Sequence, residues 1–164
     1  MAGIKYNEAL DIKFNVKKIC VVLGMNHVNL NRVYCIRSHE SSSRNIIARC
    51  HTLPKILQQV LEIEPAYVIE ILSEKFDKMS EEDQMKTLIH ELAHIPKTFG
   101  GGFRHHDFVN RRMVDKLYRE YLRNERFFTE PRPVPKPPVH LEEEETKKSD
   151  YLSENQNSLL DFEG

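Results

Sequence analysis

Residues 90–106, HELAHIPKTFGGGFRHH, constrain this chain more than any other stretch. His90 and His94 are four residues apart, so on a helix their imidazoles project from the same face, about 5–6 Å apart at Cβ. Glu91 is rotated by about 100° from His90, which lets its carboxylate act on an attacking water without occupying a coordination position. The spacing therefore predicts a helix that carries two zinc ligands and a general base.

The surroundings of the two histidines favour a metal site over a chance arrangement. A motif as short as HExxH can arise by chance in a chain with eight histidines. Here its neighbours are uncharged, as a helix buried behind a metal cleft requires: Leu88, Ile89, Leu92, Ala93 and Ile95. Ser80 and the three acidic residues that follow it predict where this helix begins.

A third ligand is needed, because catalytic zinc takes three protein ligands and leaves one position open. Pro96 favours a helix end just beyond His94. Gly100–Gly102 then permit a sharp reversal of the chain. His105 and His106 follow the reversal directly, and on residue type and position either could return to the metal.

The remaining pattern predicts helices and strands in one domain. We expect a helix from Asp11 to Leu23 that ends at Gly24, a short helix over 53–61, a strand over 66–72 and an amphipathic helix over 107–123.

Two β-rich runs, RVYCIRS (32–38) and NIIARCH (45–51), flank a serine-rich connection and predict a hairpin. In a symmetric hairpin Cys35 and Cys50 would face each other, where a disulfide is geometrically possible. No CxxC pair occurs, so free buried thiols are the simpler expectation.

Four arginines fall on the same two runs and their connection: Arg32, Arg37, Arg44 and Arg49. They raise the hypothesis of a nucleic-acid interface. Since no aromatic residues alternate with them in a known binding motif, a solvated strand face is the simpler interpretation.

The sequence divides into a folded domain, residues 1–128, and a tail, residues 129–164, that we expect to be disordered. The tail begins with PRPVPKPP and LEEEE, which cannot build a core. Gln156, Leu159 and Phe162 match the Q-x-x-L-x-x-F spacing of peptides that bind DNA sliding clamps, although so short a match can also arise by chance.

Neither a run of about 18 apolar residues nor the apolar core of a signal peptide is found. We therefore expect a cytoplasmic protein without a membrane partner.

The segments YVIEILSEKF and HELAHIPKTFGGGFRHH resemble the HELxHIP metallopeptidase family of archaea and phages, and RVYCIRSHESSSRNIIAR is similar to its upstream part. The resemblance covers roughly residues 11–122. More distantly, the arrangement is similar to SprT-like and WLM metalloproteases. It implies an α+β, zincin-like single domain whose small β-sheet packs on the HExxH helix and a C-terminal helix.

The resemblance also implies roles for individual residues. It makes His90, His94 and His106 ligands of one zinc ion and Glu91 the base that activates water for peptide hydrolysis. His105 is the alternative ligand, or a group near the ligands. The strand over 66–72 would offer its edge to an extended peptide.

Three further residues have open roles. Arg104 or His105 could hold the oxyanion, on proximity in sequence alone. Asp107 could support a ligand, but a helix cap is the simpler role. Glu70 could face the cleft or the solvent.

The leading hypothesis is a zinc-dependent peptidase, acting on proteins at DNA if the tail binds a clamp. The alternative is a non-catalytic, zinc-stabilised interaction module that its tail recruits to a sliding clamp.

Overall fold

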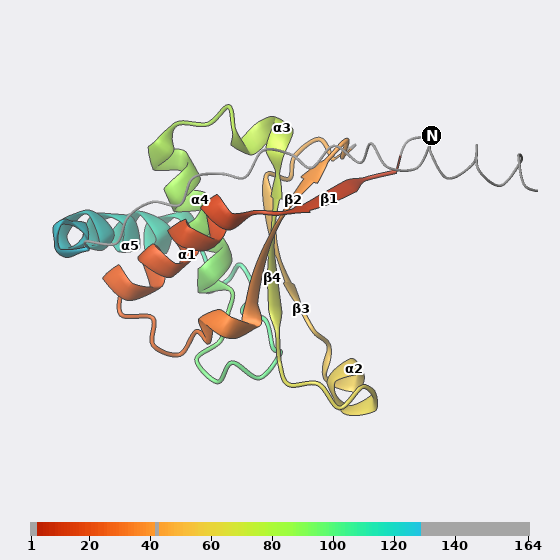
Figure 1. Cartoon of the computed structure of the whole chain (residues 1–164). Helices are drawn as coiled ribbons and strands as arrows, with labels where there is room; N and C mark the ends of the chain where they lie inside the picture. Colours follow the sequence, from red (N-terminus) through yellow and green to blue (C-terminus); the bar gives the residue numbers. More distant parts are fainter. Residues whose placement is uncertain (1–2, 42, 129–164) are drawn as a thin grey trace, which may run out of the picture.

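The computed structural model describes residues 3–41 and 43–128, in which a four-stranded mixed sheet carries helices on one face (Figure 1). The strands are β1 Lys5–Glu8, β2 Val33–His39, β3 Ala48–Thr52 and β4 Tyr67–Leu72, in the spatial order β1-β2-β4-β3. β2 and β4 are parallel, whereas β1 and β3 pair antiparallel with β2 and β4. The fold is therefore α+β, as the sequence predicts.

The helices are α1 Leu10–Val22, α2 Lys55–Val60, α3 Ser73–Phe76, α4 Glu81–Ala93 and α5 Arg111–Asn124. Two 3-10 turns, Leu30–Arg32 and Glu125–Phe127, precede β2 and follow α5. α1, α4 and α5 lie together on one side of the sheet (Figure 1). No helix of residues 3–41 and 43–128 is long and apolar enough to cross a membrane.

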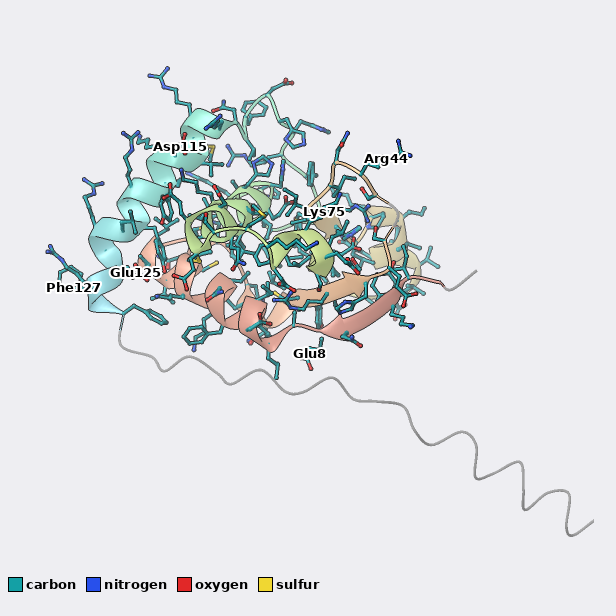
Figure 2. The ribbon with its side chains drawn as sticks, turned by 90° about the horizontal axis from the view of Figure 1, so that it is seen from above. Glu8, Arg44, Lys75, Asp115, Glu125 and Phe127 are labelled. Carbon is teal, nitrogen blue, oxygen red and sulfur yellow. The ribbon has the colours of Figure 1, made fainter. Side chains whose placement is uncertain are left out.

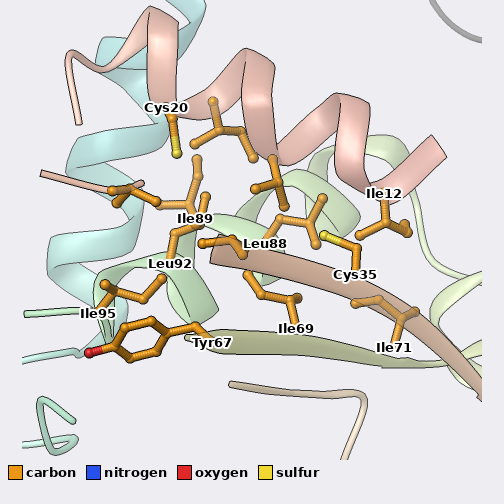
Figure 3. Close-up of a cluster of buried hydrophobic side chains, with 14 of the residues drawn as sticks. Ile12, Cys20, Cys35, Tyr67, Ile69, Ile71, Leu88, Ile89, Leu92 and Ile95 are labelled. Atoms are coloured by element: carbon orange, nitrogen blue, oxygen red, sulfur yellow. The ribbon is translucent and has the colours of Figure 1, made fainter. Parts of the chain in front are cut away.

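The core forms between the sheet and the helices that cover it (Figure 3). Tyr67, Ile69 and Ile71 alternate along β4 and all point into this layer, each fully buried. They meet apolar side chains that recur at helical spacing on α1 and α4: Ile12, Val16, Ile19, Leu88, Ile89 and Leu92. The HExxH helix is thus anchored through its apolar face.

Several local predictions are confirmed. Gly24, with φ +63°, follows α1, and Ser80 caps α4 by accepting a hydrogen bond from the Asp83 N–H at 3.2 Å. The strand over 66–72 and the short helix over 53–61 appear as β4 and α2. α4 ends at Ala93 with His94 as its C-cap, so the helix stops where Pro96 predicts.

The predicted hairpin is wrong, because β4 lies between β2 and β3. Five of the six residues of β4 are buried, so the centre of the sheet suits it better than an edge. Cys35 and Cys50 both pair with Ile69, one from each side, and therefore lie two strand spacings, roughly 10 Å, apart. A disulfide cannot span that separation, and all three cysteines are free.

The four arginines do not share one basic face. Arg37 pairs with Asp11 and Asp77, each at 2.6 Å, on the helix side of the sheet. Two more of the guanidinium groups are engaged: Arg49 on β3 pairs with Glu70, and Arg32, in the 3-10 turn before β2, donates to the carbonyl of Pro65. These arginines stabilise the fold locally, which does not support the nucleic-acid hypothesis.

Three elements of the structure differ from the sequence-based prediction or were not predicted. β1 was not predicted, since its residues KYNE are all exposed at the sheet edge. The one-turn helix α3 was not predicted either. The last helix begins at Arg111, where Asn110 accepts a hydrogen bond from the Met113 N–H, so the predicted capping role of Asp107 is wrong. The tail beyond Phe128, including Gln156, Leu159 and Phe162, lies outside the described residues.

Candidate metal centre

Three histidines from two segments meet at one point. α4 and its C-cap supply His90 and His94, and the loop before α5 supplies His106. Their nitrogens all lie within 4.8 Å of one another, and the Nε2 atoms of His90 and His94 are 3.1 Å apart. Nitrogen ligands of a tetrahedral metal ion lie roughly 3.3 Å apart, so a group of this size could hold one ion, with His106 as its exposed member.

Backbone groups fix the orientation of the His94 ring. Its Nδ1 lies 2.5 Å from the carbonyl oxygen of Arg104, and the Arg104 N–H donates to the His94 carbonyl at 2.8 Å. A proton on Nδ1 donated to that carbonyl leaves Nε2 with a free lone pair for a metal. The Phe103 ring stacks on His94 with centroids 4.3 Å apart. Arg104 therefore helps to orient the His94 ring through its main-chain groups.

The two α4 histidines favour the neutral form that binds metal. Burial, together with the smaller effect of the nearby His94 and His106, lowers the pKa of His90 to about 4. Burial also lowers the pKa of His94, although its bond to Arg104 acts in the opposite direction. Both rings can thus offer a lone pair near neutral pH without first losing a proton.

Glu91 lies in the same cleft as His90 and His106 and is 8% exposed. Burial raises the pKa of its carboxyl to about 7, and the backbone N–H of Cys50 partly offsets that rise. A carboxyl that titrates near neutral pH can both take up and release a proton under ordinary conditions.

The glycine loop is held in place by Tyr67, a residue whose role the sequence did not reveal. Its hydroxyl accepts a hydrogen bond from the Gly101 N–H and donates to the Gly102 carbonyl, both at 3.0 Å. The Tyr67 ring is fully buried and packs on Phe99, with centroids 4.8 Å apart. Tyr67 thereby links β4 to the loop that carries His106.

Of the three glycines, Gly101 alone is required by its conformation and surroundings. Its φ is +80°, and a Cβ there would lie 2.8 Å from the Leu53 carbonyl oxygen. At Gly102 a Cβ would meet nothing closer than Pro96 at 3.6 Å, and Gly100 has similar room. The reversal predicted for the glycine run thus depends on its middle residue.

A cavity of about 630 Å³ opens beside the histidines. It runs between residues 45–48 and α5, with α4 as its floor, and its walls combine an apolar part with charged groups: Ile46, Ile47, Ala48, Met79, Val114, Asp83, Lys86, Arg111 and Asp115. In Figure 2, Asp115 lies on α5 on one side of α4, and Lys75 and Arg44 lie on the other.

Two lysines brace the walls of this cavity. Lys75 donates to the carbonyls of Ser43 and Ile46, the latter at 3.1 Å, and so holds the connection before β3. Lys86 on α4 pairs with Asp115 on α5 at 2.9 Å. The cleft therefore has both sides tied to the body of the domain.

The strand edge beside the cleft differs from the prediction. β4 is paired on both sides and cannot offer an edge, whereas β3 is an outer strand, and Ala48 at its start lines the cavity. Glu70 faces neither cleft nor solvent, since it is 2% exposed and binds Arg49 and His51, at 3.0 and 2.7 Å.

His105 and Asp107 lie outside the three-histidine group. The His105 ring packs edge-on against Phe103, with centroids 5.9 Å apart, and its carbonyl accepts hydrogen bonds from Phe108 and Val109. Asp107 is exposed. The structure thus brings His106, and not His105, to the pair on α4.

Comparison with known proteins agrees with the geometry. A family model described as "Putative phage metallopeptidase" matches residues 4–130, which include every helix and strand described above. No match was found among curated proteins or among solved structures.

Proposed function

This chain belongs to the putative phage metallopeptidase family, and from that membership we propose that it is a zinc-dependent peptidase. In this proposal His90, His94 and His106 hold the ion and Glu91 is the general base. The observation that carries it is the three-histidine group, whose nitrogens lie within 4.8 Å, beside a buried carboxyl in one cleft.

The chemistry proposed is hydrolysis of an amide bond. Bound zinc would polarise the scissile carbonyl and make the attacking water more acidic. Glu91 takes a proton from that water as the water oxygen attacks the carbonyl carbon, and delivers it to the leaving amine nitrogen. Burial raises the pKa of the Glu91 carboxyl in the metal-free protein, which favours uptake of a proton by this group.

The cleft supports an extended peptide as the substrate. Among residues 3–41 and 43–128 no strand pairs with the outer edge of β3, so its main-chain groups could bind a peptide backbone as an added strand. Ile47, Met79 and Val114 offer an apolar wall for one substrate side chain. We infer a preference for a peptide with a bulky apolar residue next to the cleaved bond.

The decisive experiment combines elemental analysis with peptide cleavage. We expect about one zinc per wild-type chain, zinc without cleavage in Glu91→Gln, and loss of both in His90→Ala. His105→Ala is the matched control for His106→Ala: the first should keep zinc affinity and activity, and the second should bind zinc more weakly and lose activity.

The same variants separate the peptidase from a non-catalytic zinc module. If Glu91→Gln and wild type bind zinc equally and are equally inert on broad peptide libraries and DNA-bound proteins, the module is the better description. Recruitment to DNA through a sliding clamp rests on the tail sequence alone, and deletion of 156–162 tests it.

A further inference from the structure

A second concave surface lies away from the metal centre, along the outer side of α1. It is a groove of about 590 Å³ between α1 and the chain entering β2. Its walls are mostly apolar, and two lysines one helical turn apart are among its lining residues: Leu10, Lys13, Phe14, Val16, Lys17, Leu30, Asn31 and Val33. An apolar floor beside positive charge suits an acidic segment that also carries apolar side chains.

The chain leaves the domain beside this groove. Phe128, the last described residue, packs edge-on against Phe14 with ring centroids 6.0 Å apart, and Phe14 lines the groove. The Lys18 ammonium lies 5.7 Å from the Phe128 ring centroid and pairs with Glu125. These contacts fix the starting point of the tail next to α1.

The tail contains a segment with the matching chemistry. Residues 139–145, VHLEEEE, place Val139 and Leu141 directly before four glutamates. The preceding proline-rich stretch carries Arg132 and Lys136, which the two groove lysines would repel. Residues 129–138 can span up to roughly 35 Å, so the acidic segment is within reach of the groove.

We propose that this groove is the intramolecular docking site for residues 139–145. Leu141 fills the apolar floor beside Phe14 and Leu30, and the glutamates that follow pair with Lys13 and Lys17. Tethering raises the effective concentration of the segment to about the millimolar range, so a modest intrinsic affinity is sufficient.

Zero-length carbodiimide coupling of the full chain tests the proposal, because it joins a lysine to a carboxylate only when the two are in contact. Peptide mass spectrometry should find Lys13 or Lys17 joined to a residue within 142–145. Coupling in a mixture of ¹⁴N- and ¹⁵N-labelled protein should give products of a single isotope, as an intramolecular contact requires.

Two tail substitutions form a matched pair that leaves the folded domain unchanged. Leu141→Ser keeps all the acidic residues and removes the apolar anchor, so the initial coupling rate should fall by about tenfold. Val134→Ser makes a similar change in the proline-rich stretch and should leave the rate unaltered.

Three results would overturn the proposal. The first is equal coupling in wild type and Leu141→Ser. The second is coupling of the glutamates to the exposed Lys5 and Lys55 as often as to the groove, or coupling of the groove to Glu154, Asp161 or Glu163. The third is mixed-isotope products in the share that random pairing of the two labels gives, which would identify a second copy of the chain as the occupant.

Discussion

The two segments that form the candidate metal centre are built in different ways. His90 and His94 are set by helix periodicity, and α4 is anchored by apolar residues buried in the core. His106 is exposed on a loop whose course depends on hydrogen bonds to Tyr67 and on the conformation of Gly101. Two of the candidate ligands are thus positioned by local structure, and the third by tertiary contacts.

The largest difference is expected between the ligands themselves. Replacing His94 by alanine removes one of the three proposed metal ligands and also leaves the Arg104 carbonyl without its ring partner. We expect zinc affinity to fall on the order of a thousandfold or more in His94→Ala and less in His106→Ala. Competition with a chromophoric chelator measures the zinc affinity of both variants. An equal loss of affinity would contradict the difference proposed between the histidine at the end of α4 and the histidine on the loop.

Alanine substitution should destabilise the glycine loop at Gly101 but not at the neighbouring Gly102. Gly101→Ala would strain a residue at φ +80° and press a methyl group onto the Leu53 carbonyl, so we expect a loss of about 2–3 kcal/mol in the free energy of unfolding. Gly102→Ala should cost less than about 1 kcal/mol. Urea unfolding of the two variants compares them, and similar midpoints would mean that the loop is not fixed as described.

The buried Glu91 carboxyl on α4 makes the free energy of unfolding depend on pH. The pKa of Glu91 is raised to about 7 in the folded protein, so the stabilising effect of its neutral form is complete below about pH 4.5 and is lost as pH rises through 7. In metal-free protein, Glu91→Gln should therefore raise the free energy of unfolding by up to roughly 3 kcal/mol at pH 8.

Near pH 4.5 the same substitution should have a much smaller effect, since Glu91 is then neutral in the folded protein and about half neutral in the unfolded chain. Thermal unfolding at the two pH values, with chelator present, measures the difference. A stabilisation that does not change with pH would exclude the buried charge as its cause.

The smallest effect is expected from the residue that supports the loop. Tyr67→Phe keeps the buried ring but removes both hydrogen bonds to the glycine loop, and we expect zinc affinity to fall by about tenfold. In the His106→Ala background the same change should have no further effect, because the contribution of the loop is already lost.

Tyr121→Phe serves as the matched control for this prediction. It removes a hydroxyl that donates to Glu125 at the far end of α5, and it should leave zinc affinity unchanged. Additive losses in the Tyr67→Phe, His106→Ala double variant would show that Tyr67 acts through general stability instead.

The same division explains what the sequence could predict. The spacing and capping of α4 and the apolar run of β4 are local patterns, and both elements lie where predicted. Whether β2 and β3 pair with each other cannot be read from local sequence, because a serine-rich connection can join either neighbouring strands or strands with another strand between them. Here β4, which is buried along most of its length, takes the central position between β2 and β3.

The site shows the same limit. Residue type and position did not decide whether His105 or His106 joins the two histidines of the motif. In the fold Phe103 packs against both His94 and His105, and it is His106 whose ring lies with His90 and His94. Tyr67 could not be recognised, because a tyrosine at the start of a β-branched run is equally suited to a core position. Its hydroxyl acquires a role only once the glycine loop has returned to β4.

The position of β4 also constrains the order of folding. β4 follows β2 and β3 in the chain but lies between them, so neither its parallel nor its antiparallel ladder can form until residues 67–72 have been inserted. Such long-range pairing slows folding. α4 follows β4 closely in the chain, and side chains of both lie in one buried cluster, so we expect completion of the sheet and docking of the helix that carries His90 to be coupled.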